Sequence, residues 1–125
     1  MLQHLKRKAE KEGLEDRIQI VKGEASASGL ENESVDLAMA NSVFHELSSP
    51  EAVLKEMLKV LRPGGWVMIS DFRDTAITEL ICRSHGENAH GPFGINELET
   101  LLTKARLNNV EVSLVRHWVI GMGKK

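Results

Sequence analysis

The fold is decided by residues 35–72, which read VDLAMANSVFHELSSPEAVLKEMLKVLRPGGWVMISDF. Two runs in this stretch, residues 37–40 and residues 66–69, are apolar without a break. Continuous apolar runs of this length between turn residues are typical of parallel strands that are covered on both faces. The sequence therefore predicts two buried strands here.

The segment between these two strands predicts a helix that has its own start and stop. Ser49 can cap the helix, and Pro50 suits the first helical position. An apolar stripe at helical spacing follows, formed by Val53, Leu54, Met57, Leu58 and Leu61. Residues 63–65, Pro-Gly-Gly, cannot continue the helix and permit a sharp turn into the second strand. Together these elements predict one right-handed βαβ unit.

The sequence before this unit predicts a helix, a strand and a loop. Leu2, Leu5 and Ala9 lie on one face of the helix, and residues 18–21 (IQIV) form a short strand. Residues 26–34 are rich in Ser, Gly and Asn and predict a polar loop.

The sequence after the unit predicts two helices and two strands. Asp74 or Thr75 can cap the first helix, and a mobile glycine-rich loop follows at residues 85–94. Asn96 and Glu99 have the spacing of a capping box at the start of the second helix. Residues 110–114 alternate between apolar and polar and predict a half-buried strand. The connection to a strand from Trp118 is short, so we expect an antiparallel pair. The fold class is α/β.

Length and composition limit the classes of function. A chain of 125 residues suits one domain, residues 1–125, with its own core. A net charge of −2 and few aromatic side chains argue against a nucleic-acid partner. The sequence shows no apolar run long enough to span a membrane and no signal-peptide core. The single cysteine excludes an internal disulfide and favours a cytoplasmic setting.

Three strand ends offer polar side chains for a binding site, because ligands collect at the carboxyl ends of parallel strands. Glu24 follows the first predicted strand, Asn41 follows the second and Asp71 follows the third. Each side chain could bind a ligand or could only cap the turn that follows. The sequence leaves both interpretations open.

His45 and Glu46 suggest a general base with an orienting carboxylate, but adjacent helical residues do not face each other. His45 is therefore interpreted as a ligand contact or as a partly buried loop residue. Cys82, His85 and His90 offer too few ligands for zinc, so we expect no metal site. The sequence has no phosphate loop and no nucleophile elbow, and no helix follows the glycines of residues 121–123.

Three segments, taken in order, resemble the later part of class I S-adenosylmethionine-dependent methyltransferases of the ubiquinone/menaquinone-biosynthesis type. They are residues 34–47 (SVDLAMANSVFHEL), residues 54–65 (LKEMLKVLRPGG) and the hydrophobic strand that ends in Asp71. Residues 1–23 resemble the helix and third strand of that family. The resemblance implies a Rossmann-like fold whose sheet is mostly parallel, with an antiparallel strand pair at the C-terminal end. It also implies S-adenosylmethionine as cofactor and methyl transfer to a small-molecule acceptor.

The resemblance also implies roles for individual residues. Glu24 and Ala25 match a pair near the adenine of the cofactor, and the segment Asn41, Ser42 and Val43 lies beneath the cofactor. His45 lies near the cofactor or the acceptor, and His45 and Asp71 are the candidates to orient the acceptor. Catalysis in this class rests largely on proximity and in-line orientation, so no strong nucleophile is required.

The family's first two strands, with its glycine-rich loop and ribose-binding acid, would precede Met1. We therefore expect a domain that is truncated at the N-terminus and holds the adenine side of the site. Each unpaired ribose hydroxyl or methionine carboxylate costs about 1–3 kcal/mol, so we expect weak cofactor binding or none. Two functions stay open: a methyltransferase, or a non-catalytic half-domain that assembles with itself or with a partner.

The sheet order of the family, 3-2-1-4-5-7-6, puts both missing strands between the strand at residues 18–21 and the strand at residues 37–40. The second of these would then be an apolar, unpaired edge, which is a poor edge for a monomer. We expect either that residues 18–21 move across to pair with it or that a second chain covers it. The sequence thus predicts a homo-oligomer or a strand-exchanged dimer.

Overall fold

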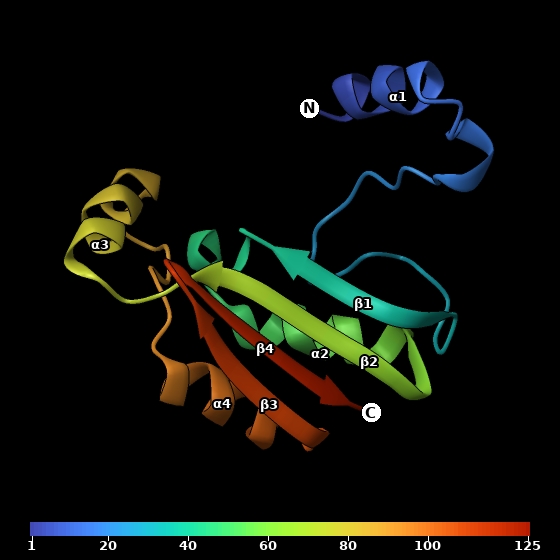
Figure 1. Cartoon of the computed structure of the whole chain (residues 1–125). Coiled ribbons are helices and arrows are strands. Elements are labelled where there is room, and N and C mark those ends of the chain that lie inside the picture. Colours follow the sequence, from blue (N-terminus) through green and yellow to red (C-terminus); the bar gives the residue numbers. More distant parts are fainter.

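A four-stranded sheet in the order β1-β2-β4-β3 forms the body of the protein (Figure 1). The computed structural model describes residues 1–125 with the exception of the side chain of His85. The strands are β1 (Val35–Asn41), β2 (Leu61–Phe72), β3 (Asn108–Val115) and β4 (Trp118–Lys124). The helices are α1 (Leu2–Lys11), α2 (Pro50–Val60), α3 (Ala76–Cys82) and α4 (Ile95–Lys104), with 3-10 turns η1 (Glu15–Arg17), η2 (Phe44–Glu46) and η3 (Arg83–His85).

The predicted βαβ unit is confirmed, but the predicted burial of its first strand on both faces is wrong, because Leu37 and Met39 are 53% and 62% exposed. β1 and β2 are parallel, α2 connects them, and their register runs from Leu37 opposite Trp66 to Asn41 opposite Ser70. Pro50 is the first residue of α2, although the side chain of Ser49 makes no capping hydrogen bond. β4 is antiparallel to both β2 and β3, which confirms the predicted antiparallel pair at the end of the chain.

Helices α2 and α4 lie on one face of the sheet, and the core lies between them and the strands (Figure 1). The core contains Ala38, Phe44, Val53, Leu54, Met57, Leu61, Val67, Ile69, Phe93, Leu98, Leu102, Leu107 and Val119. Of the predicted helical stripe, only Leu58 is less than fully buried. No helix among the described residues is long and apolar enough to cross a membrane.

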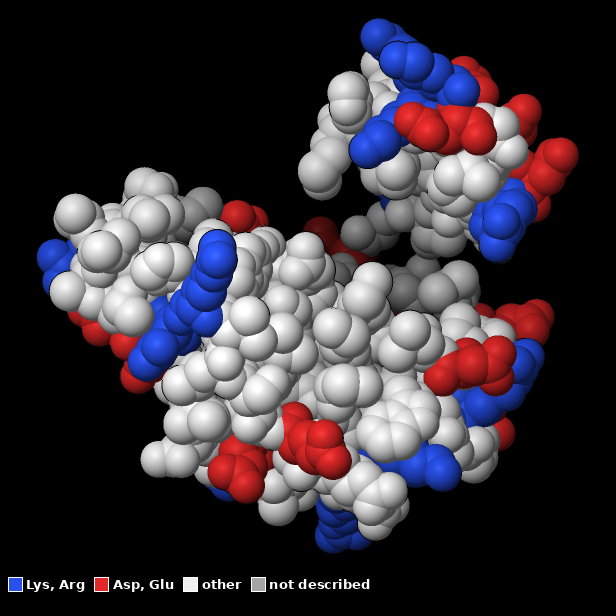
Figure 2. Space-filling view, in the orientation of Figure 1, with Lys and Arg blue, Asp and Glu red and all other residues white. Residues whose placement is uncertain are grey.

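The prediction of a strand at residues 18–21 is wrong. This segment follows η1 in an extended conformation but pairs with no strand, and Ile18 and Val21 are 38% and 43% exposed. α1 and this segment stand apart from the body of the protein (Figures 1 and 2). A strand needs a neighbour for its backbone hydrogen bonds, and no strand edge lies beside this segment. The sheet is therefore mixed instead of mostly parallel: β1 and β2 pair in parallel, whereas β2–β4 and β3–β4 are antiparallel pairs.

The sharp turn predicted at residues 63–65 is also wrong. β2 already begins at Leu61, directly after α2, and the Pro-Gly-Gly segment forms an irregularity inside the strand. Val35 lies opposite Leu61 and Leu37 lies opposite Trp66, so β2 advances five residues while β1 advances two. Gly64 permits this bulge because its φ of +80° is open to glycine at little cost.

Two helix starts were predicted after β2, and the structure confirms the first but not the second. Thr75 caps α3, because its hydroxyl accepts a hydrogen bond from the Thr78 N–H at 3.2 Å. The capping box predicted at Asn96 and Glu99 is wrong, since α4 begins two residues earlier with Gly94 as its N-cap. Glu97 supplies the carboxylate instead and accepts from the Gly94 N–H at 3.3 Å.

Gly121 allows α4 to pack closely on β4. A Cβ at this position would lie 2.8 Å from a methyl carbon of Leu102 and 2.8 Å from one of Leu98. We expect Gly121→Val to lower the free energy of unfolding by about 1–3 kcal/mol, because both leucines must leave their rotamers. Urea denaturation measures this change. The matched control is Met122→Val on the opposite face of β4, and equal losses in both variants would contradict the explanation.

Glu56 anchors the polar loop to α2. Its carboxylate accepts hydrogen bonds from the Ser28 N–H at 3.0 Å and the Ser28 hydroxyl at 2.7 Å, and it lies 3.0 Å from the ammonium of Lys59. The hydrogen bond from the Ser28 side chain, followed by that from Lys59, lowers the pKa of Glu56 below its ordinary value of 4.5.

A lowered pKa in the folded state contributes stability that is present above the ordinary pKa and is lost as the pH falls through the lowered one. We therefore expect wild type to be more stable than Glu56→Gln near neutral pH, with the difference shrinking once the pH falls below 4.5. Urea denaturation of both proteins across this pH range checks the prediction. A difference that does not depend on pH would contradict it.

Candidate functional site

The carboxyl ends of β1 and β2 lie side by side and carry most of the predicted site residues. Asn41 lies opposite Ser70, and the Ser42 N–H donates to the Ser70 carbonyl at 2.8 Å. Asn41 and Val43 are exposed, and Ser42 is held at a φ of +54°. The structure therefore brings the segment Asn41, Ser42 and Val43 to an open rim beside the end of β2.

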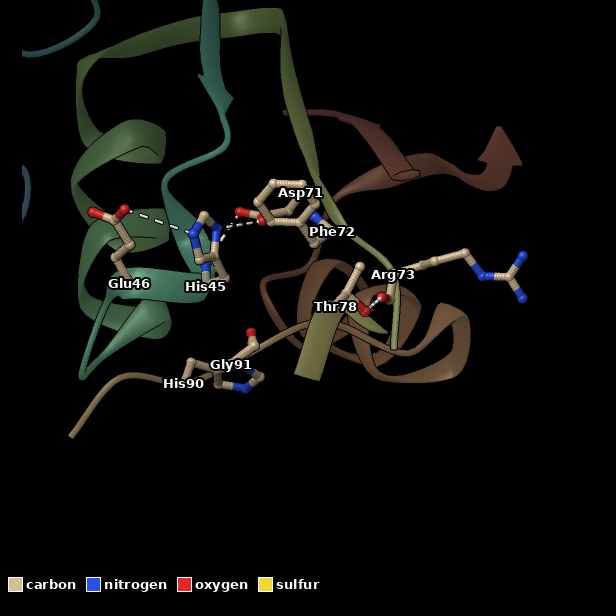
Figure 3. A network of polar contacts seen from close by, with 8 residues as sticks. All are labelled: His45, Glu46, Asp71, Phe72, Arg73, Thr78, His90 and Gly91. Atoms are coloured by element: carbon tan, nitrogen blue, oxygen red, sulfur yellow. Dashed lines mark hydrogen bonds and ion pairs between the residues drawn. The ribbon is translucent and has the colours of Figure 1, made fainter. Parts of the chain in front are cut away.

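His45 and Asp71, which the sequence offered as separate candidates, form one buried pair (Figure 3). The Nδ1 of His45 lies 2.7 Å from an Asp71 carboxylate oxygen, and the other oxygen accepts from the His45 backbone N–H at 3.1 Å. The Phe72 N–H donates to the same carboxylate at 2.7 Å. A carboxylate oxygen without a proton only accepts hydrogen bonds, so the His45 tautomer that fits this contact carries its proton on Nδ1.

The Nε2 side of the His45 ring, opposite Asp71, faces Glu46 (Figure 3). Nε2 lies 3.6 Å from a carboxylate oxygen of Glu46, and the Phe72 ring lies edge-on at 4.9 Å between centroids. The expectation that His45 and Glu46 do not face each other is wrong, because Asp71 holds the ring with Nε2 directed toward Glu46. His45 is only 2% exposed and Asp71 is 0% exposed.

The second half of the loop that was predicted to be mobile is hydrogen-bonded to the site. The Gly91 N–H donates to the His45 carbonyl, and the Phe93 N–H donates to the Phe72 carbonyl, each at 2.9 Å. The Phe93 side chain is buried against Phe44 and stacks on His90. Sequence reasoning missed this segment, and its one signal was an isolated aromatic residue in a glycine-rich loop.

Glu24 and Ala25 lie away from the sheet in an exposed turn. The Ala27 N–H donates to the Glu24 carbonyl at 3.0 Å and closes this turn. Among the described residues, no strand pairing and no hydrogen bond links the turn to Asn41. Within one copy of the chain, the predicted adenine pair is therefore not joined to the rest of the predicted site.

Cys82, which was weighed as a metal ligand together with His85 and His90, is buried next to the site. Burial raises the pKa of its thiol, and the negative charges of Asp71 and Glu46 raise it further. No cluster of three or more His, Cys, Asp or Glu side chains with metal-binding geometry occurs in the described part of the chain. The side chain of His85 lies outside the described residues.

The fold and the site define a class of protein. A parallel βαβ unit, an antiparallel strand pair beside its second strand, and polar residues at the strand ends make a Rossmann-like domain of the methyltransferase type. Residues 1–69 match the sequence profile of a methyltransferase domain. The chain belongs to this methyltransferase domain family.

Two relatives share sequence with the chain, and each is a malonyl-[acyl-carrier protein] O-methyltransferase. The protein of Methylococcus capsulatus is 37% identical over 65 residues, which cover 52% of this chain and 24% of the relative. The protein of Priestia megaterium is 30% identical over 86 residues, which cover 68% of this chain and 31% of the relative. The matches thus span about a quarter to a third of the length of these relatives.

A solved structure shares the fold. The SAM-dependent methyltransferase from Aquifex aeolicus superposes with a TM-score of 0.70 at 23% identity. The match covers 94% of this chain and 60% of that one. The observed strand order corresponds to the segment 4-5-7-6 of the sheet order that the resemblance implied.

Proposed function

We propose that this domain takes part in S-adenosylmethionine-dependent methyl transfer to an oxygen atom of a small-molecule acceptor. The single observation that carries the proposal is the open rim of Asn41, Ser42 and Val43 at the joined carboxyl ends of β1 and β2. Membership of the methyltransferase domain family supports it. Two relatives named O-methyltransferases and a structural neighbour named SAM-dependent support the acceptor atom and the cofactor.

The residues of this rim fit one side of the cofactor. Asn41 offers both a donor and an acceptor, which suits a nucleobase edge or a hydroxyl. Val43 offers an exposed apolar side chain on which a flat base can lie. Ser42 is held in a left-handed conformation, and strained residues of this kind cluster at ligand sites. Asn41, Ser42 and Val43 are thus the residues that would hold the cofactor.

His45 and Asp71 act as positioning residues in this proposal. Both are buried, so neither side chain reaches a ligand directly. Asp71 joins the end of β2 to η2 through the backbone and the ring of His45, and this fixes the chain that leads away from Asn41. When bound, the cofactor would supply an electrophilic methyl group. The contribution of the protein is then to hold the reacting groups in line.

A second candidate function is a non-catalytic half-domain that assembles with itself or with a partner. The rim offers no cation for the carboxylate of the methionine moiety and no acid for the ribose hydroxyls. Under this alternative the 125-residue chain would bind the cofactor weakly and would not turn it over alone.

Amide chemical shifts of the labelled protein, recorded during a titration with S-adenosylhomocysteine, test the proposed site. We expect saturable shifts at Asn41, Ser42, Val43 and Gly91, and we expect Asn41→Ala to weaken them. The matched control is Asn96→Ala, which removes an exposed amide at the start of α4. Shifts that avoid the β1 and β2 ends, or that are equally weakened by both variants, would contradict the proposal.

A further inference from the structure

His90 connects the loop before α4 to three other parts of the chain. Its backbone N–H donates to the Leu47 carbonyl at 2.9 Å, directly after η2. Its ring stacks on Phe93 at 3.9 Å between centroids, with 5° between the ring planes. Its Nε2 lies 3.1 Å from a carboxylate oxygen of Glu97 in α4. The next residue, Gly91, donates to the His45 carbonyl at 2.9 Å, so these contacts adjoin the site (Figure 3).

Both ring nitrogens of His90 lie next to oxygen atoms that can only accept hydrogen bonds. Nδ1 lies 3.1 Å from the Gly91 carbonyl, and Nε2 faces the carboxylate of Glu97. A neutral imidazole has one N–H, so it can donate to one of these oxygens while its lone pair faces the other. An imidazolium donates to both at once. The observed arrangement is therefore that of a protonated ring.

The charged groups around His90 also favour the imidazolium. The groove between α2 and α4 borders the ring on one side, and its charged side chains are Glu51, Lys55, Glu97 and Lys104. A second cavity borders the ring on the side of α3, and its titratable and charged side chains are Glu79, Cys82, Arg83 and Glu87. On η2 the titratable groups are His45 and Glu46, which face each other. Glu97 is the carboxylate at ion-pair distance from the ring, so the direct contact stabilises the positive charge.

We propose that His90 is a pH-sensitive positioning residue, whose imidazolium holds residues 90–93 against η2 and the end of β2. Loss of the proton leaves one ring nitrogen with its lone pair toward an oxygen, which breaks one contact and loosens the segment. Because the closed segment binds the proton more readily than the loosened one, a low pH favours the closed segment. The change falls in the range between about pH 5 and pH 8, where histidine side chains change their charge.

The effect reaches the site through the backbone. The Gly91 N–H donates to the His45 carbonyl and the Phe93 N–H donates to the Phe72 carbonyl, each at 2.9 Å. His45 and the Phe72 N–H in turn share the carboxylate of Asp71. A loosened segment therefore loosens the chain that leads away from Asn41, Ser42 and Val43. This step rests on the proposed function, in which a rise in pH would weaken the binding of the cofactor.

Amide hydrogen exchange of the protein without any ligand tests the proposal. The measured quantity is the protection factor of Gly91 divided by that of Ile69, which is buried in β2 and reports global unfolding. We expect this ratio to fall about 3- to 10-fold in the wild type from about pH 5 to pH 8, because one contact of the ring is lost. A ratio that stays constant over this range would overturn the proposal.

Two variants assign the pH dependence to His90. His90→Phe keeps a ring that can stack on Phe93 but cannot bind a proton, so we expect its ratio not to change with pH. The matched control is His117→Phe at the exposed turn between β3 and β4, which should keep the pH dependence of the wild type. A pH dependence as large as that of the wild type in His90→Phe would contradict the proposal.

Glu97→Gln tests the same contact without a change to the ring. The glutamine amide can donate to the neutral ring and its carbonyl can accept from the protonated one, so we expect the ratio to change less than about 3-fold. An unchanged pH dependence in Glu97→Gln would also contradict the proposal. None of these measurements uses the cofactor, so they fail or succeed independently of the amide-shift titration of the proposed site.

Discussion

Asp71→Ala is expected to lower the free energy of unfolding by about 3 kcal/mol or more, because it removes the acceptor of two buried hydrogen bonds and one partly buried one. The His45 ring and the His45 N–H would lose their partner in the interior, and the Phe72 N–H would lose its partner at the border of the interior. Urea denaturation followed by fluorescence of the two tryptophans measures the loss.

Two control experiments measure how much of this loss is due to the contact between His45 and Asp71. Asp71→Asn keeps one acceptor oxygen and is expected to cost less than Asp71→Ala. A double-mutant cycle with His45→Ala is expected to show a coupling energy of about 1 kcal/mol or more, since the two side chains are in direct contact. A loss below about 1 kcal/mol for Asp71→Ala, together with no coupling, would show that the pair does not hold the strand ends together.

Phe93→Ala is expected to cost about 3–5 kcal/mol, because a fully buried ring that closes the loop onto the site leaves a cavity. The Phe93 ring lies 6.3 Å from that of Phe44 and 3.9 Å from that of His90, measured between centroids. Without it, the hydrogen bonds from Gly91 and Phe93 to the site lose their packing support.

Amide hydrogen exchange reports this second effect. We expect faster exchange at Gly91 and Phe93 in the Phe93→Ala variant, beyond the change due to global stability alone. The matched control is Ile95→Ala, a partly exposed position two residues along the chain, which should change stability by less than about 1 kcal/mol. Similar losses in both variants would contradict the anchoring role of Phe93.

Local sequence signals predicted the βαβ unit well. The unbroken apolar runs, the apolar stripe and Pro50 all act within a few residues of one another, and the structure confirms the two strands and the helix that they predict. Burial of the first strand on both faces was predicted wrongly, since Leu37 and Met39 are exposed, and Leu61 begins β2 instead of ending α2. The same signals placed Asn41, Ser42 and Val43 at a strand end. Local pattern was sufficient because each of these elements buries its apolar face against a neighbour in the same unit.

Features that depend on distant residues were predicted poorly. Residues 18–21 have the composition of a strand, but a strand forms only where another edge is present, and none lies beside them. His45 and Asp71 are 26 residues apart, so their hydrogen bond became visible only once β1 and β2 were aligned. The anchoring of Gly91 and Phe93 depends in the same way on carbonyls of η2 and β2.

The rim of Asn41, Ser42 and Val43 lies at the end of β1, so it can contact the cofactor from one side only. In the proposed function, Asn41, Ser42 and Val43 contact the adenosine group of the cofactor, and none of these three side chains carries a charge for the methionine carboxylate. Binding energy should therefore come from the adenosine part of the cofactor, while the charged tail remains in solvent.

Calorimetric titration with S-adenosylmethionine and with 5′-methylthioadenosine, which lacks the methionine carboxylate and amine, tests this claim most directly. We predict weak binding of both compounds, with dissociation constants within about threefold of each other, because a tail left in solvent contributes little. Micromolar binding of S-adenosylmethionine by this chain, at least about 100-fold tighter than that of methylthioadenosine, would contradict the claim.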